Sequence, residues 1–246
     1  MKDSLFEDET ASSAKPAKGK KKGQGNKKQG EELTNALATV LAKAIDDFLA
    51  VKNDAASSRV FIEDIYKKIL QVDSDDPVWK LLGFLENKSD YYTAPASTHY
   101  HGSYAGGLVI HSLSVLSWCI KLSAVMLKKT PNYYALTTAC LFHDLCKVNM
   151  YEEKTRNVKD EKTGRWESVP CYKVKENYLA MGHGIESVLR LNEFLKLPQP
   201  WLYAVRFHMG AYGDDDMLSL GKATRSFAEV LLLHTADMMA GIVNNV

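Results

Sequence analysis

Histidine and aspartate residues interrupt several apolar segments of this 246-residue chain. His143 and Asp144 are adjacent near the end of one apolar run, while His111 and Asp237 each lie inside another. An isolated carboxylate is costly to bury, so an aspartate in such a position needs a partner. A metal ion is one such partner. A helix cap or an arginine is another, and the His-Asp dipeptide alone leaves these alternatives open.

Two more histidines stand beside glycines, which allow a close approach of backbone or ligand. They are His183, between Gly182 and Gly184, and His208, two residues before Gly210. Four imidazoles and two carboxylates form a donor set that suits Mn²⁺, Fe²⁺, Co²⁺, Ni²⁺ or Zn²⁺ rather than Ca²⁺. The candidate metal ligands are therefore His111, His143, Asp144, His183, His208 and Asp237.

The other histidines have weaker claims to a role. His99 and His101 lie in a loop that precedes the segment of His111. They can line a pocket, support a metal ligand or lie on the surface, and the sequence leaves these three roles open. His234 comes three residues before Asp237 on nearly the same helical face, which suits either a supporting contact or a structural one. We interpret the acidic run 214–216 as a solvated loop.

Apolar residues recur at three- and four-residue spacing along most of the chain, which is typical of amphipathic helices. The expected helices cover about 31–49, 60–69, from 77 onward, 108–128, 133–148, 185–195, 200–208 and 224–243. Residues 151–178 break this rhythm, because charged and β-prone residues alternate there around Thr163-Gly164, a plausible turn. The predicted fold class is all-α with one protruding β-hairpin.

Composition excludes several classes of protein. At 46% hydrophobic residues the chain can bury a sizeable core. We expect no membrane span, since no stretch approaches the run of about 20 apolar residues that a bilayer requires, and the polar N-terminus lacks the apolar segment of a secretion signal. Four cysteines without a CxxC pair favour a reducing compartment, so the predicted location is the cytoplasm.

Charge divides the chain into a tail and a folded part. Residues 1–30 carry eight lysines against four acidic residues, and we predict that this lysine-rich tail is disordered. Such a tail can contact nucleic-acid phosphates by counterion release, or it can serve only to solubilise. The expected organisation is the tail (1–30), a helix and linker (31–59) and one catalytic domain (60–246).

The order His111, His143-Asp144, His183, His208, Asp237 resembles the HD-domain superfamily of metal-dependent phosphohydrolases, in particular its two-metal branch. The strings APASTHYH from Ala94, GGLVIHSLS from Gly106 and HDLCK from His143 are most similar to the HD domain of bacterial 3′-to-5′ exoribonucleases. They are also similar to HD domains of conjugative relaxase-type proteins. The resemblance covers residues 60–246 and implies an HD-domain helical bundle.

The resemblance also implies roles for the residues. His111, His143, Asp144 and Asp237 would bind one divalent ion, and Asp144 would bridge to a second ion held by His183 and His208. Two ions about 3.5–4 Å apart can activate a water and neutralise charge on a phosphoryl oxygen. Asp144 and Lys147 would thus be catalytic, since the family's matching lysine contacts substrate phosphate. The alternative for Lys147 is a solvated lysine at a helix end, where the helix dipole favours it.

Three features depart from the family's pattern. Cys146 replaces the usual glycine before the lysine, Met209 replaces a second histidine, and residues 31–60 leave no room for an OB-fold. Other residues can compensate for the missing OB-fold through contacts with phosphates and stacking on bases. Scattered aromatic residues in a helical domain also serve packing. The residues in question are Arg206, Arg225, Tyr100, Tyr104 and Tyr212.

Three functions follow as hypotheses. The leading one is a metal-dependent phosphohydrolase, acting on a phosphoester of a nucleotide or nucleic acid. The second is a mixed-valence di-iron oxygenase of the same fold, because proteins of that kind have a similar ligand order. The third is a non-catalytic, nucleic-acid-associated protein that keeps the metal for stability.

Overall fold

A computed structural model describes residues 23–99, 102–159, 161–176, 178, 181–212 and 217–243, with side chains from residue 35 onward. Most of the predicted lysine-rich tail lies outside the described residues. Helix α1 (Gly23–Leu49) begins eight residues before the expected boundary at Glu31. Residues 23–30 therefore belong to this helix, although only their lysines and glutamines are good helix formers and their three glycines are poor ones.

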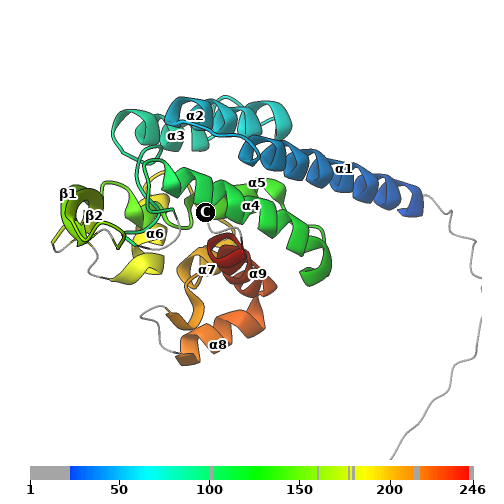
Figure 1. Ribbon diagram of the computed structural model, residues 1–246. Helices are drawn as coiled ribbons and strands as arrows, with labels where there is room; N and C mark the ends of the chain where they lie inside the picture. The colour runs from blue at the N-terminus through cyan, green and yellow to red at the C-terminus, as the bar shows by residue number, and fades with distance from the viewer. Residues whose placement is uncertain are drawn as a thin grey trace, which may run out of the picture.

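The described chain is mostly helical, with one two-stranded antiparallel sheet, as the sequence predicts (Figure 1). After α1, the α-helices are α2 (Ala55–Asp64), α3 (Val78–Asn87), α4 (Gly107–Met126), α5 (Tyr133–Phe142), α6 (Gly182–Asn192), α7 (Gln199–Arg206), α8 (Met217–Ser226) and α9 (Ala228–Met238). Short π-helices η1 (Ile65–Ile69) and η4 (Met239–Val243) extend α2 and α9, and the 3₁₀ turns are η2 (Leu145–Lys147) and η3 (Gly210–Tyr212).

Helix α4 runs through the centre of the domain and contacts α1, α5, α9 and η4 (Figure 1). Because neighbours cover it on several sides, it is apolar around most of its circumference. The expectation that no segment is long and apolar enough to span a bilayer was wrong for α4, which meets that criterion by length and composition. The helix is nevertheless 67% buried within the domain over its most apolar window, which is the pattern of a core helix.

Helix α5 ends at Phe142, earlier than the expected end at residue 148. The carbonyls left open at a helix end need other partners. His143 Nδ1 donates to the Cys140 carbonyl at 2.8 Å, and the hydroxyl of buried Tyr91 donates to the Leu141 carbonyl at 2.7 Å. The chain then turns through Asp144 into η2, so His143 and Asp144 stand at the end of α5 rather than within it.

The predicted C-terminal helix, about 224–243, is two helices in the structure. Phe227 is extended, with φ −138° and ψ 114°, and α8 meets the α9–η4 segment at 111°. The reason is local packing, because the Phe227 ring lies 5.4 Å from that of Tyr203 and packs against a small apolar cluster of Phe207, Ala223 and Val230. Sequence periodicity could not show this break, since neither glycine nor proline marks it.

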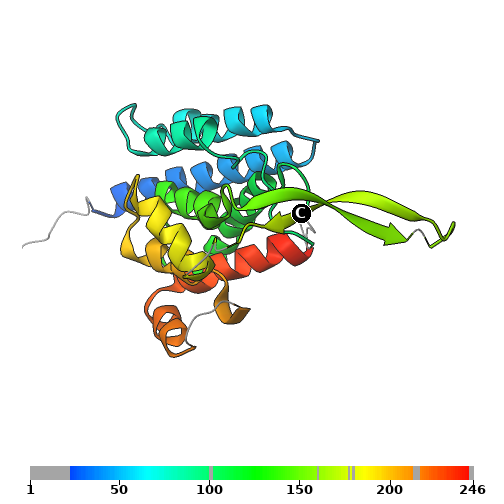
Figure 2. The same cartoon turned by 90° about the vertical axis from the view of Figure 1, so that its left-hand side faces the viewer.

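Strands β1 (Tyr151–Lys159) and β2 (Trp166–Val174) form the predicted hairpin, paired from Tyr151 with Val174 to Lys159 with Trp166. Its turn includes Gly164 at φ +70°, which agrees with the predicted turn. The hairpin projects away from the helical body (Figure 2), and most of its residues are exposed. At its base the hairpin contacts the domain, because the Tyr151 hydroxyl donates to the Ala96 carbonyl at 3.3 Å.

A glycine sets the distance between α6 and the end of α7. A Cβ added at Gly184 would lie 1.9 Å from the carbonyl oxygen of Arg206, so only glycine allows this approach. The contact brings His183, at the start of α6, next to His208, just beyond α7. The sequence-based interpretation of the glycines beside these histidines is therefore confirmed for Gly184.

We predict that Gly184→Ala lowers the free energy of unfolding by about 1–3 kcal/mol, because the added methyl group must push two backbones apart. The control is Gly83→Ala in α3, where nothing lies within 4 Å of the added Cβ. That change should stabilise the protein by about 0.5–1 kcal/mol through helix propensity. Urea unfolding of both variants measures the difference, and equal effects would contradict the close-packing argument.

Candidate metal centre

All six predicted ligands converge on the buried carboxylate of Asp144 and its neighbour Asp237. Asp144 Oδ2 lies 3.3 Å from His143 Nε2, and Oδ1 lies 3.4 Å from His208 Nε2 and 4.0 Å from His183 Nδ1. Asp237 Oδ1 lies 3.0 Å from His111 Nε2 and 3.8 Å from His143 Nε2. Segments far apart in sequence, from α4, the end of α5, α6, the end of α7 and α9, therefore supply one cluster.

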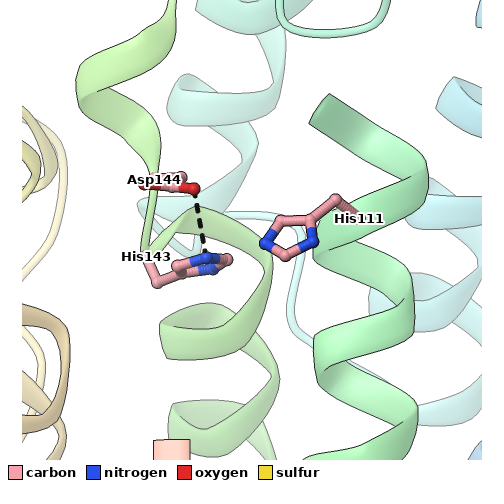
Figure 3. Close-up of side chains that lie close together, drawn as sticks. All are labelled: His111, His143 and Asp144. Carbon is pink, nitrogen blue, oxygen red and sulfur yellow. Dashed lines mark ion pairs between the residues drawn. The ribbon is translucent and has the colours of Figure 1, made fainter. Parts of the chain in front are cut away.

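Figure 3 shows how His111 on α4 faces the His143-Asp144 pair at the end of α5. The imidazole rings of His111 and His143 are 5.4 Å apart, and those of His143 and His208 are 4.9 Å apart. His143 and His208 are fully buried and His111 is 1% exposed. Three imidazoles in so small a buried volume need a reason other than hydrophobic packing.

Backbone carbonyls orient two of the rings. His143 Nδ1 donates to the Cys140 carbonyl and His208 Nδ1 donates to the Val205 carbonyl, both at 2.8 Å. With Nδ1 protonated in the neutral ring, Nε2 carries a lone pair. Neither Nε2 atom has a hydrogen-bond partner in the part of the chain that the structure describes. Metal-ligating histidines are usually held in this way, with one nitrogen fixed by a carbonyl and the other left for the ion.

Three groups of side chains offer ligand atoms that all lie within 4.8 Å of one another. They are His111, His143 and Asp144; His143, His208 and Asp237; and Asp144, Cys146 and His183. Each group can hold a metal ion. The six predicted ligands are all included, and Cys146 is an addition that the sequence analysis treated only as a departure from the family's pattern.

Lys147 is buried beside the same carboxylate. Its Nζ lies 2.7 Å from Asp144 Oδ2 and donates to the Ala96 carbonyl at 2.8 Å. The hydroxyl of Tyr151 donates to the same carbonyl at 3.3 Å. The alternative interpretation of Lys147 as a solvated lysine was therefore wrong. The 3₁₀ turn of η2 places Lys147 three residues after Asp144 on the same side, and a buried ammonium and carboxylate stabilise each other's charge.

Burial and neighbouring charges shift the pKa values of the cluster in opposite directions. Burial by itself would raise the pKa of Asp144, but the charges of Lys147 and His143 hold this pKa well below its usual value. The pKa of Asp237 is lowered in the same way, chiefly by the hydrogen bond from His111. Burial lowers the pKa of His111. For His143 the effect of burial is outweighed by Asp144, so its pKa is raised.

A pocket of about 170 Å³ opens onto the cluster. Its wall combines polar groups of the centre with apolar side chains from the end of α9 and from η4. The lining residues are His111, Asp144, Lys147, Met209, Tyr212, His234, Asp237, Met238, Gly241 and Ile242. Met209 and Tyr212, next to His208, give this space an apolar and aromatic rim.

His234 lines the same pocket and contacts the turn that carries His208. Its Nδ1 donates to the backbone carbonyl of His208 at 2.7 Å, which ties α9 to the turn that carries this ligand. A bond to a backbone carbonyl fits both interpretations that the sequence left open for His234, and its partner is His208 rather than Asp237.

Several other candidates are not among the donor groups or the residues that line the pocket. His99 is exposed, and Tyr104 is 46% exposed and is not among the pocket residues. Arg206 lies over the ring of Phe207, with 4.7 Å between Cζ and the ring centroid. Arg225 lies near Gly221 on α8. The candidates Tyr100, His101 and 214–216 fall outside the described residues.

Comparison with known proteins gives no relative for this chain: no family model, no curated protein and no solved structure matches it.

We predict that the metal-free protein loses stability as the pH falls below about 5. The unfolded Asp144 carboxyl takes up its proton at a higher pH than the folded one, whose pKa is depressed. Unfolding therefore binds protons in this range, and the stability present above the unfolded pKa is lost as the pH falls towards the folded pKa. Denaturant unfolding between pH 6 and pH 3 measures the slope.

Asp144→Asn removes this titrating group and should give a shallower dependence of the unfolding free energy on pH, even if the variant is less stable at pH 6. A slope identical to that of the unchanged protein would mean that Asp144 is not a source of the acid sensitivity.

Proposed function

We propose that the chain is a metal-dependent phosphohydrolase that hydrolyses a phosphoester of a nucleotide or nucleic acid. The hypothesis rests on the order of ligands that resembles the HD-domain superfamily, and on one structural observation that supports it. That observation is the pair of fully buried imidazoles, His143 and His208, whose Nε2 atoms lack hydrogen-bond partners among the described residues and face Asp144.

The donor set fits a pair of divalent ions. A structural histidine would be expected to use both ring nitrogens, because an unsatisfied buried polar atom costs about 1–3 kcal/mol. Two carboxylates and four imidazoles also match the ions of intermediate hardness, from Mn²⁺ to Zn²⁺. We propose that His111, His143, Asp144 and Asp237 hold one ion, and that Asp144 shares its second oxygen with an ion held by His183 and His208.

When bound, such ions lower the pKa of a water molecule and neutralise charge on a phosphoryl oxygen. The chain's own residues then have separate tasks. Asp144 and Asp237 supply the negative charge that retains the ions, and the carbonyls of Cys140 and Val205 keep His143 and His208 in the orientation that exposes Nε2. His234 holds the turn of His208 in place through its hydrogen bond.

Two residues of the pocket are consistent with a substrate that carries a phosphate group and a nucleobase. Lys147 lines the pocket and carries a positive charge, since its pKa is raised above the usual value by Asp144 in spite of burial. Such an ammonium can stabilise charge on a phosphoryl oxygen. Tyr212 lines the same pocket and is 74% exposed, so its ring is accessible for stacking on a base.

The first test counts metal ions in protein purified without added metal. We expect close to two ions per chain in the unchanged protein and close to one in His183→Ala, because this variant removes a ligand of only one ion. Asp144→Ala should lose both the ions and hydrolysis of nucleotide phosphodiesters. His99→Ala is the matched control, since this exposed histidine should be replaced without effect.

Retention of full phosphodiesterase activity by Asp144→Ala would overturn the proposal. A single ion that is unaffected by His183→Ala would place His183 outside the centre and favour a mononuclear enzyme. Iron as the bound element, with a product that forms only in the presence of O₂, would assign the chain to the oxygenase alternative instead.

A second test concerns the base. Tyr212→Ala should raise the KM for a nucleotide substrate at least about fivefold, because a base–aromatic stack contributes about 1–3 kcal/mol. The value of kcat should change little, since stacking far from the reacting bond binds substrate and transition state equally. Steady-state kinetics on the nucleotide and on the matching base-free sugar phosphate separate the two effects.

Tyr104→Ala serves as the control for this test, because Tyr104 is exposed but lies outside the pocket. A rise in KM of the same size for the base-free substrate would mean that Tyr212 shapes the pocket and does not bind a base.

A further inference from the structure

Cys146 lies in η2, two residues after Asp144, and its side chain is fully buried. Its sulfur is 3.4 Å from His183 Nδ1 and 4.0 Å from Asp144 Oδ1. His183 Nδ1 and Asp144 Oδ1 are also 4.0 Å apart. A thiol, an imidazole nitrogen and a carboxylate oxygen thus surround one small space, and all three are metal donors.

The backbone of η2 fixes the thiol in this position. The Cys146 amide donates to the hydroxyl of Ser187, a buried residue of α6, at 3.2 Å. Since α6 also carries His183, the two donors are held by the same helix contact. Cys119 and Cys140 have different surroundings from Cys146, because they are buried within the main apolar cluster.

A second observation points to an ion at this place. Asp144 Oδ1, the oxygen that faces Cys146 and His183, is also the oxygen nearest to the Nε2 of His208, at 3.4 Å. His208 is fully buried, and its Nε2 has no hydrogen-bond partner among the described residues. The donors around Asp144 Oδ1 therefore include an imidazole nitrogen that the described chain leaves unsatisfied.

We propose that Cys146 is a ligand of the ion that Asp144, His183 and His208 hold, and that its sulfur makes this half of the centre selective for thiophilic ions. The proposal rests on the metal centre proposed above and deepens it, but it does not depend on the reaction catalysed. It assigns a role to the residue that replaces the family's glycine.

The chemistry of binding is simple. The S–H bond of Cys146 breaks, a bond forms between the sulfur and the divalent ion, and the proton leaves to solvent, without any change of oxidation state. A thiolate is a soft donor, so it raises the affinity for Zn²⁺, Cd²⁺ and Co²⁺ far more than for Mn²⁺ or Mg²⁺, which prefer oxygen. The other half of the centre, around His111 and Asp237, has nitrogen and oxygen donors only and lacks this preference.

The test titrates metal-free protein with Co²⁺ and Cd²⁺ under a non-thiol reductant. Each ion gives a sulfur-to-metal charge-transfer band in the ultraviolet when a thiolate binds it, at shorter wavelength for Cd²⁺ than for Co²⁺. We expect this band in the unchanged protein and its loss in Cys146→Ser, with an affinity for Cd²⁺ that falls at least about tenfold. The affinity for Mn²⁺ should change by much less, because Mn²⁺ gains little from sulfur.

Cys171→Ser is the matched control, because Cys171 lies in strand β2 of the hairpin and belongs to none of the three donor groups. It should leave both the band and the affinity unchanged. X-ray absorption on the zinc-loaded protein gives a second measurement on the unchanged chain, with a sulfur neighbour expected at about 2.3 Å from zinc. This measurement decides the question even if Cys146→Ser does not fold.

A band that survives in Cys146→Ser, or zinc bound without a sulfur neighbour, would overturn the inference. If the unchanged protein binds Co²⁺ and hydrolyses phosphoesters but shows no thiolate band, Cys146 is not a ligand and the proposed function stands. If the unchanged protein binds no divalent ion at all, the metal centre, the proposed function and this inference fail together.

Discussion

The arrangement of this domain depends on the burial of one carboxylate, Asp144, which is only 3% exposed. A charge in that position must be balanced by groups that are themselves held in place. Lys147 supplies the balancing charge, and three imidazoles lie within 4.0 Å of the two carboxylate oxygens. The residues around Asp144 and Asp237 come from α4, the end of α5, η2, α6, the end of α7 and α9, so the packing of these elements fixes the cluster.

Short interruptions of the helices make that delivery possible. The end of α5 at Phe142 lets His143 and Asp144 leave the helix direction, and bonds from His143 and Tyr91 satisfy the carbonyls that this end exposes. Gly184 allows α6 to approach the end of α7. The end of α5 gives up helical hydrogen bonds, and a glycine at 184 gives up side-chain packing. Both features bring ligand side chains into the polar cluster.

The polar cluster is more than a set of satisfied buried groups. Backbone carbonyls fix His143 and His208 through Nδ1, and their Nε2 atoms face Asp144 at 3.3 and 3.4 Å without a hydrogen-bond partner among the described residues, which is unfavourable unless another species binds there. A divalent cation fits this requirement, and Lys147 and Tyr212 line the adjoining pocket, where we propose that a nucleotide phosphoester binds. The thiol of Cys146 lies in one of the three donor groups, and we propose that it makes one half of the cluster selective for thiophilic ions.

The sequence by itself determined the helical class and the hairpin, because apolar periodicity is a local signal. It also singled out six side chains that the structure brings together, because polar residues inside apolar segments and histidines beside glycines are visible locally. It did not determine where α5 ends or that the last helix is broken at Phe227, since both follow from contacts with distant residues such as Tyr91 and Tyr203. Only the tertiary structure decided that Lys147 is buried and that Cys146 lies 3.4 Å from His183. The spacing of residues along a chain does not set the distances between side chains on different helices, because these distances depend on how the helices pack.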